Sequence, residues 1–161
     1  MEIPNKWEKS VVVIGQKYDV RHLTGEVEEV TSPIGTGVLL RTDRFILVTA
    51  KHVVFDQDGR LRHDLCFWGN KLNGSVFPPR SFVELSNKWP NIRWVSHGNK
   101  DIDLAAIIVG SDLAEEDVAF VTLDDFKPAD KLRKGEDIYY LGFPSGFGAR
   151  YGSNPLLRKG I

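Results

Sequence analysis

The fold of this chain is decided by the stretch Gly35-Thr36-Gly37-Val38-Leu39-Leu40, continued after a short turn by Phe45-Ile46-Leu47-Val48-Thr49-Ala50-Lys51-His52. Both parts are predicted to be β-strands, joined by the polar residues 41–44. The glycines of the first strand let another backbone approach closely. The second strand is apolar and β-branched enough to be buried on both faces. His52 follows where this strand ends, a position that combines a rigid support with access for a substrate.

A lone histidine is more often structural than catalytic, so the case for His52 rests on its surroundings. These surroundings resemble the trypsin/chymotrypsin-like serine peptidases, in particular their bacterial HtrA-like members. In that family a strand with Gly-x-Gly precedes a strand that ends in Thr-Ala-x-His, and the histidine is the general base. Gly35-Thr36-Gly37 and Thr49-Ala50-Lys51-His52 match both parts. The resemblance implies that His52 is a general base, to be followed along the chain by an acid and then a serine.

The acid of this family stands at the start of a buried strand, directly before an aliphatic residue. Asp103-Leu104-Ala105-Ala106-Ile107 has this form. Asp101 also precedes an aliphatic residue, but its register would place Asp103 inside the strand, so Asp103 is preferred. By resemblance, Asp103 is buried beside the imidazole, fixes its tautomer and stabilises the imidazolium. The alternative for Asp103 is a structural carboxylate that caps a turn.

Residues 135–146, Gly-Glu-Asp-Ile-Tyr-Tyr-Leu-Gly-Phe-Pro-Ser-Gly, resemble the opening of the second barrel in HtrA-like proteins. The family's nucleophile lies beyond it in Gly-x-Ser-Gly-Gly, which this sequence lacks. Ser145 is the nearest counterpart, but Pro144 before it has no N–H for an oxyanion hole. Cys66 precedes the acid, in the wrong order for a nucleophile. We therefore expect no nucleophile in this chain, and a chain truncated before the nucleophile motif.

Many short strands separated by turn signals predict an all-β fold. Together with the family resemblance, this pattern predicts a trypsin-like double β-barrel. Residues 1–110 are expected to form a complete, six-stranded antiparallel barrel with the base and the acid, residues 111–135 a linker between barrels, and residues 136–161 the start of the second barrel. Strands are expected at 10–16, 35–40, 45–50, 61–68, 92–95, 104–109, 138–141 and 155–161. Residues 18–33 are expected to form a loop or an exposed hairpin, and Pro78-Pro79 to lie in a loop or at a sheet edge.

The composition limits the partners and the cellular location that we expect for the protein. The chain has 161 residues, a net charge of −1 and one cysteine, Cys66. The small charge gives no reason to expect a nucleic acid or an anionic membrane as partner. No apolar run approaches a membrane span, and the N-terminus lacks the apolar core of a signal peptide. A single cysteine excludes the internal disulfides that secreted members of the resembled family often carry, so we expect a cytoplasmic protein.

The resemblance implies part of a serine endopeptidase, with His52 and Asp103 in the chain and the serine outside it. Two alternatives stay open: an inactive trypsin-fold domain that binds peptides or proteins, and an unrelated small β-barrel interaction module. The expected partners are a polypeptide substrate or peptide ligand, and a second copy through the incomplete second barrel. No cofactor is expected. His63 and Cys66 have a His-x-x-Cys spacing, but no second pair completes a zinc site, so no metal is expected.

Overall fold

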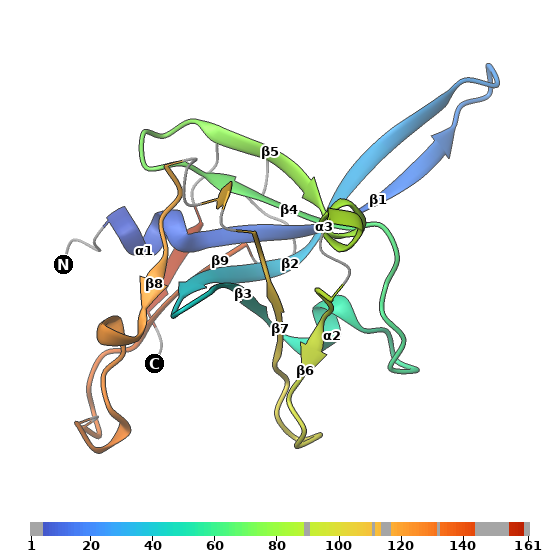
Figure 1. Cartoon of the computed structure of the whole chain (residues 1–161). Helices are drawn as coiled ribbons and strands as arrows, with labels where there is room; N and C mark the ends of the chain where they lie inside the picture. The colour runs from blue at the N-terminus through green and yellow to red at the C-terminus, as the bar shows by residue number, and fades with distance from the viewer. Residues whose placement is uncertain are drawn as a thin grey trace.

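The computed structural model describes residues 5–88, 91–110, 112–113, 117–131, 133–143 and 155–159. These residues form an all-β fold, as predicted, with a few short helices (Figure 1). The main sheet has eight strands in the order β5-β4-β1-β2-β3-β7-β6, with β8 beside β2. Its strands are β1 Val11–Arg21, β2 Val27–Arg41, β3 Phe45–Thr49, β4 Leu65–Asn70, β5 Val76–Ser81, β6 Val95–Ser96, β7 Ala105–Ile108 and β8 Val121–Thr122. Every ladder along this path is antiparallel, whereas β8 runs parallel to β2.

The strands β1, β2 and β3 form the middle of the main sheet because their side chains supply its core. Val12 and Ile14 of β1 are fully buried, as are Leu39 of β2 and Leu47 of β3. Each such aliphatic side chain contributes about 1.5–3 kcal/mol when it leaves water. The predicted strands at residues 35–40 and 45–50 are thus confirmed, with Val38 opposite Val48 in their ladder, but β3 is fully buried on one face only and not on both.

The β1–β2 hairpin extends far beyond the sheet and projects from the body of the protein (Figure 1). Its outer part pairs Tyr18 with Val30 and Arg21 with Val27. The hairpin turns at His22, whose N–H donates to the carbonyl of Glu26 at 2.9 Å. Of the two alternatives for residues 18–33, the exposed hairpin is therefore the correct one.

The predicted closure of a complete barrel is not observed in the described part of the chain, where no ladder joins β5 to β6. The chain between them includes the helix α3 (Phe82–Lys88), which the sequence analysis did not predict. Ser81 favours the helix, since its Oγ accepts the N–H of Val83 at 3.2 Å. Phe82 stacks on Phe67 of β4, with ring centroids 5.2 Å apart, and meets Trp94 edge-on at 5.0 Å. Aromatic packing, rather than backbone pairing, thus spans the gap.

A second correction concerns the strand expected at residues 61–68. The strand β4 begins only at Leu65, because Asp64 before it adopts a left-handed backbone with a φ of 52°. That conformation does not fit an extended strand, and aspartate is among the few residues that adopt it readily. Pro78 and Pro79 lie in β5, at the end of the strand order, as predicted.

The C-terminal part begins a second, two-stranded sheet of β9 (Tyr139–Gly142) and β10 (Leu156–Lys159). The two strands pair antiparallel, so the hairpin expected within residues 136–161 is present. Phe143 after β9 is buried in the main core, and its N–H donates to Oγ1 of Thr36 at 2.9 Å. The division of the chain into residues 1–110, 111–135 and 136–161 stays a prediction.

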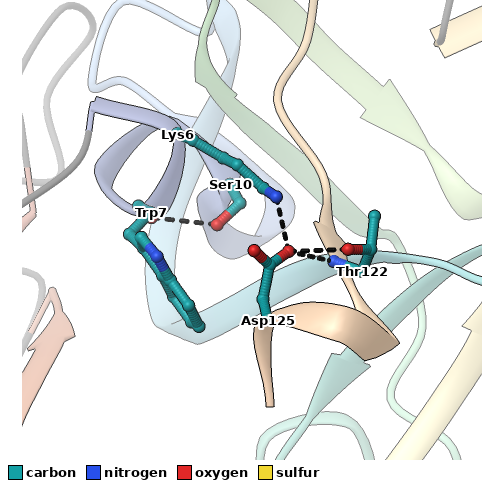
Figure 2. Close-up of polar contacts among 5 residues, drawn as sticks. All are labelled: Lys6, Trp7, Ser10, Thr122 and Asp125. Carbon is teal, nitrogen blue, oxygen red and sulfur yellow. Dashed lines mark hydrogen bonds and ion pairs between the residues drawn. The ribbon is translucent and has the colours of Figure 1, made fainter.

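The segment expected as a linker also holds the N-terminal helix α1 (Asn5–Ser10) in place. Lys6 of this helix pairs with Asp125 at 2.5 Å, and the same carboxylate accepts the N–H and the hydroxyl of Thr122 at 2.7 and 2.8 Å (Figure 2). Figure 2 also shows Ser10, whose hydroxyl donates to the carbonyl of Trp7 at 2.9 Å. The partners of Asp125, first Lys6 and then Thr122, lower the pKa of that carboxyl to about 2.

The helices of the described chain are short. The helix α2 (Lys51–Val54) is a single turn, and two 3₁₀ turns, η2 (Leu123–Asp125) and η3 (Ala129–Lys131), follow β8. None of the helices in the described ranges is long and apolar enough to cross a membrane.

Replacing Gly35 by alanine is expected to destabilise the protein. The added Cβ would lie 2.5 and 2.6 Å from the two γ-carbons of Val53, a stiff side chain on the turn that carries His52. Overpacking of this kind costs about 1–3 kcal/mol, measurable by urea unfolding. Gly98→Ala is the matched control, because its Cβ meets no atom within 4 Å. Equal stability of the two variants would contradict the packing described here.

Candidate active site

The position of His52 is set by a strand end and by one helical turn. The hydroxyl of Thr49, the last residue of β3, donates to the carbonyl of Thr36 on β2 at 2.8 Å. Ala50 remains extended, and α2 then begins. Val53 and Val54 of this turn are buried in the core. Because these two side chains point inward, His52 projects outward, with 74% of its side chain exposed.

Asp103 lies in the turn between β6 and β7, next to the same strand end. Thr49 pairs with Ala105, so the end of β3 and the start of β7 are neighbours. The turn is held by the N–H of His97, which donates to the carbonyl of Leu104 at 2.8 Å. Asp103 thus precedes the strand β7, as the sequence predicted, and lies beside α2, but β7 is buried on one face only, through Ala105 and Ile107.

The structure brings His52 and Asp103 into direct contact. Nδ1 of His52 lies 2.5 Å from Oδ2 of Asp103, and the backbone N–H of His52 donates to Oδ1 at 3.0 Å. The side-chain hydrogen bond to His52, followed by the backbone one, lowers the pKa of Asp103. An ionised carboxylate can only accept, so Nδ1 carries the proton in this hydrogen bond. Nε2 of a neutral His52 is then free to accept a proton.

One expectation about the acid is not met. Asp103 was expected to be buried, but 53% of its side chain is exposed. The turn that carries it extends past the sheet, and its neighbours Ile102 and Leu104 are exposed as well. The carboxylate is therefore oriented by hydrogen bonds to His52 and not by burial.

The remaining candidates lie elsewhere or play other roles. Asp101 shares the turn, where its N–H donates to Oδ1 of Asn99 at 3.0 Å, whereas the carboxylate that accepts hydrogen bonds from His52 is that of Asp103. Cys66 is fully buried in β4, and burial raises the pKa of its thiol to about 11, which makes it unreactive. Ser145 lies outside the described residues. Within the part of the chain that the structure covers, no three His, Cys, Asp or Glu residues are grouped to hold a metal.

Thr36 is a residue of the site region whose role the sequence did not reveal. Its carbonyl accepts from Thr49, and its hydroxyl accepts from the N–H of Phe143. It therefore connects the strand end before His52 with the start of the second sheet. The available signal was its place between two glycines, Gly35 and Gly37.

Comparison with known proteins identifies the fold and the family of the chain. Among solved structures, it is similar to the HtrA-type protease AlgW solved with a decapeptide, with a TM-score of 0.53 and 16% identity over 97% of this chain and 42% of that chain. This likeness shows a trypsin-like fold. A family model described as trypsin-like peptidase domain matches residues 35–161. The chain belongs to this family, and it spans less than half of the length of the HtrA-type protease chain. No curated protein sequence matches it.

Removing the imidazole is expected to raise the pKa of Asp103 toward its ordinary value. Hydrogen bonds from His52 lower this pKa, so His52→Ala removes the largest cause of the shift. In the wild type, the ionised carboxylate stabilises the fold above the unfolded pKa, and this contribution is lost as the pH falls through the lower folded pKa. Carboxyl ¹³C NMR titration measures the effect.

His22→Ala is the control for this titration, because His22 is exposed on the distant hairpin and pairs with Glu28. It should leave the pKa of Asp103 unchanged. An unchanged pKa in His52→Ala would show that the hydrogen bond does not control the carboxyl.

Proposed function

We propose that this chain supplies the base and the acid of a serine endopeptidase, with His52 as general base and Asp103 as its orienting acid. The observation that carries the proposal is the 2.5 Å contact between Nδ1 of His52 and Oδ2 of Asp103. It leaves Nε2 on an exposed side chain just beyond the end of β3. Membership of the trypsin-like peptidase family supports protease-type chemistry.

The proposed reaction assigns one task to each group. Nε2 of His52 takes the proton of a serine hydroxyl while the serine oxygen bonds to the scissile carbonyl carbon. Asp103 stabilises the imidazolium that results. The imidazolium then gives its proton to the amine leaving group as the C–N bond breaks, which leaves an acyl-enzyme. Water hydrolyses this ester with His52 again as base and regenerates the free serine.

The proposal places the serine outside these 161 residues. The sequence contains no Gly-x-Ser-Gly-Gly, and the chain spans 42% of the HtrA-type protease that it resembles in fold. The oxyanion hole and the pocket that selects the substrate would also be supplied by chain outside these residues. The substrate is proposed to be a polypeptide, from the family chemistry alone.

A second candidate function is an inactive trypsin-fold domain that binds peptides. The missing nucleophile motif favours it. The two candidates differ in whether a longer form of this protein carries the serine motif. They also differ in whether His52 matters for function, since binding alone does not require a base.

The 161-residue chain is expected to neither hydrolyse casein nor react with a fluorophosphonate probe. Each missing oxyanion-hole donor typically costs about 2.7–4 kcal/mol in transition-state stabilisation. Loss of the nucleophile removes nearly all of the contribution of the triad, because its members act together. A longer chain with the serine motif should react with the probe, and His52→Ala in that chain should abolish labelling.

Ser145→Ala in the 161-residue chain is the control. Labelling of this chain that Ser145→Ala removes would contradict the assignment of the nucleophile. Full labelling of the longer chain in the His52→Ala form would contradict the role of the base.

We also propose that the β9–β10 sheet mediates self-association. In the described chain β9 and β10 pair only with each other, so each leaves an open edge. Tyr140 and Leu157 on these strands are 53% and 43% exposed. Open edges with apolar side chains recruit further strands.

Light scattering of the 161-residue chain should therefore give a mass that rises with protein concentration. Leu157→Lys places a charge on the edge and should lower this mass. Leu72→Lys, at a similarly exposed leucine in the turn between β4 and β5, should not change it. A constant monomer mass, or an equal effect of the two variants, would rule out this edge.

A further inference from the structure

The outer face of β3, β7 and β6 is apolar although it faces solvent. In the register, Ile46 of β3 lies opposite Ile108 of β7, and Val95 of β6 lies opposite Ala106. Val95 is 61% exposed and Ile108 is 36% exposed. The opposite face of the same strands carries the core residues Leu47 and Ile107. A sheet that is apolar on both faces indicates that its outer face is covered at some stage.

This outer face is hollowed next to the edge of the sheet. The hollow has a volume of about 230 Å³, and it is lined by Ile46, Asn91, Ile92, Arg93, Val95, Ala106, Ile107 and Ile108. An apolar cavity of about 150 Å³ already holds a benzene ring. The hollow therefore has room for one aliphatic side chain, and it is too small for most drug-sized ligands.

The edge of β6 next to this hollow is open. In the described part of the chain, β6 pairs with β7 on one side and with no strand on the other. The N–H of His97 donates to the carbonyl of Leu104 across the hairpin. Val95, two residues earlier, pairs with Ala106, so its N–H and C=O also face β7. By the alternation of an antiparallel ladder, the N–H and C=O of Ser96 point toward the open edge. An added strand would find both a donor and an acceptor there.

The charge at the rim of the hollow is positive. Arg93 lines the hollow and is exposed. Among the residues that the structure describes, it has no ion-pair partner. A guanidinium binds a carboxylate through two parallel hydrogen bonds, which gives orientation as well as affinity.

We propose that this hollow and the edge of β6 bind an extended peptide with an aliphatic side chain close to a carboxylate. The peptide would add as a strand to Ser96, insert its aliphatic side chain beside Val95, and pair its carboxylate with Arg93. Adding a strand to an open sheet edge is a common mode of peptide recognition, with pockets for alternate side chains. This binding is separate from the chemistry proposed for His52 and needs no nucleophile.

The test is an NMR titration of the 161-residue chain, with ¹³C-labelled isoleucine and valine methyl groups. The probe is an acetylated and amidated peptide, Glu-Thr-Ile-Thr-Glu, and the control peptide has asparagine in place of the isoleucine. The probe should shift the methyl signals of Ile46, Val95 and Ile108 in a saturable way, and the control peptide should not.

Two variants test the two polar contacts. Arg93→Glu should weaken binding by about tenfold or more, the size expected when a hydrogen bond to a charged group is lost. Arg21→Glu on the distant hairpin is the matched charge reversal and should leave binding unchanged. Ser96→Pro removes the edge donor without touching the ladder to β7, and it should abolish binding while the free methyl spectrum stays that of a folded protein.

Three results would overturn the proposal. The first is a probe peptide that produces no shifts at these methyl groups. The second is binding that is unaffected in both Arg93→Glu and Ser96→Pro. The third is a change of the Ile108 signal with protein concentration in the absence of peptide, which would identify a second copy of the chain as the occupant.

Discussion

The candidate site depends on the pairing of β3 with β7. The ladder sets Thr49 opposite Ala105, and the residues just outside it are those that carry His52 and Asp103. Side chains alternate between the faces of a strand, so a slip by one residue would turn the buried Leu47 to solvent. The cost of exposing this core fixes the register. The register in turn brings the two side chains within hydrogen-bonding distance.

The same region joins the two sheets. Thr36 accepts the hydroxyl of Thr49 through its carbonyl and the N–H of Phe143 through its own hydroxyl. Phe143 is buried in the core of the main sheet. The start of the second sheet is thus attached to the strands that position His52, although both members of the His52–Asp103 pair are exposed. Two exposed side chains beside the ends of rigid strands are compatible with the proposal that further chain completes the site.

The parts of the fold that could be predicted from the sequence are those in which the local pattern of apolar residues matches their burial in the structure. The glycine-flanked strand and the one ending at Thr49 were predicted, and register favoured Asp103 over Asp101. The helix α3 was not predicted, because a short apolar run such as residues 82–85 fits a strand or a helix equally well. Packing of Phe82 against two other aromatic rings decides for the helix. The exposure of Asp103 could not be predicted either, since it depends on which distant segments cover the turn.

The hydrogen bond between His52 and Asp103 can be measured directly in a protein with ¹⁵N-labelled histidine. Long-range ¹H–¹⁵N NMR at a pH where the imidazole is neutral identifies the nitrogen that carries the proton. We expect the proton on Nδ1, with a downfield resonance that Asp103→Ala removes, because the carboxylate can only accept. A proton on Nε2, or an Nδ1 proton that is unchanged in Asp103→Ala, would contradict it.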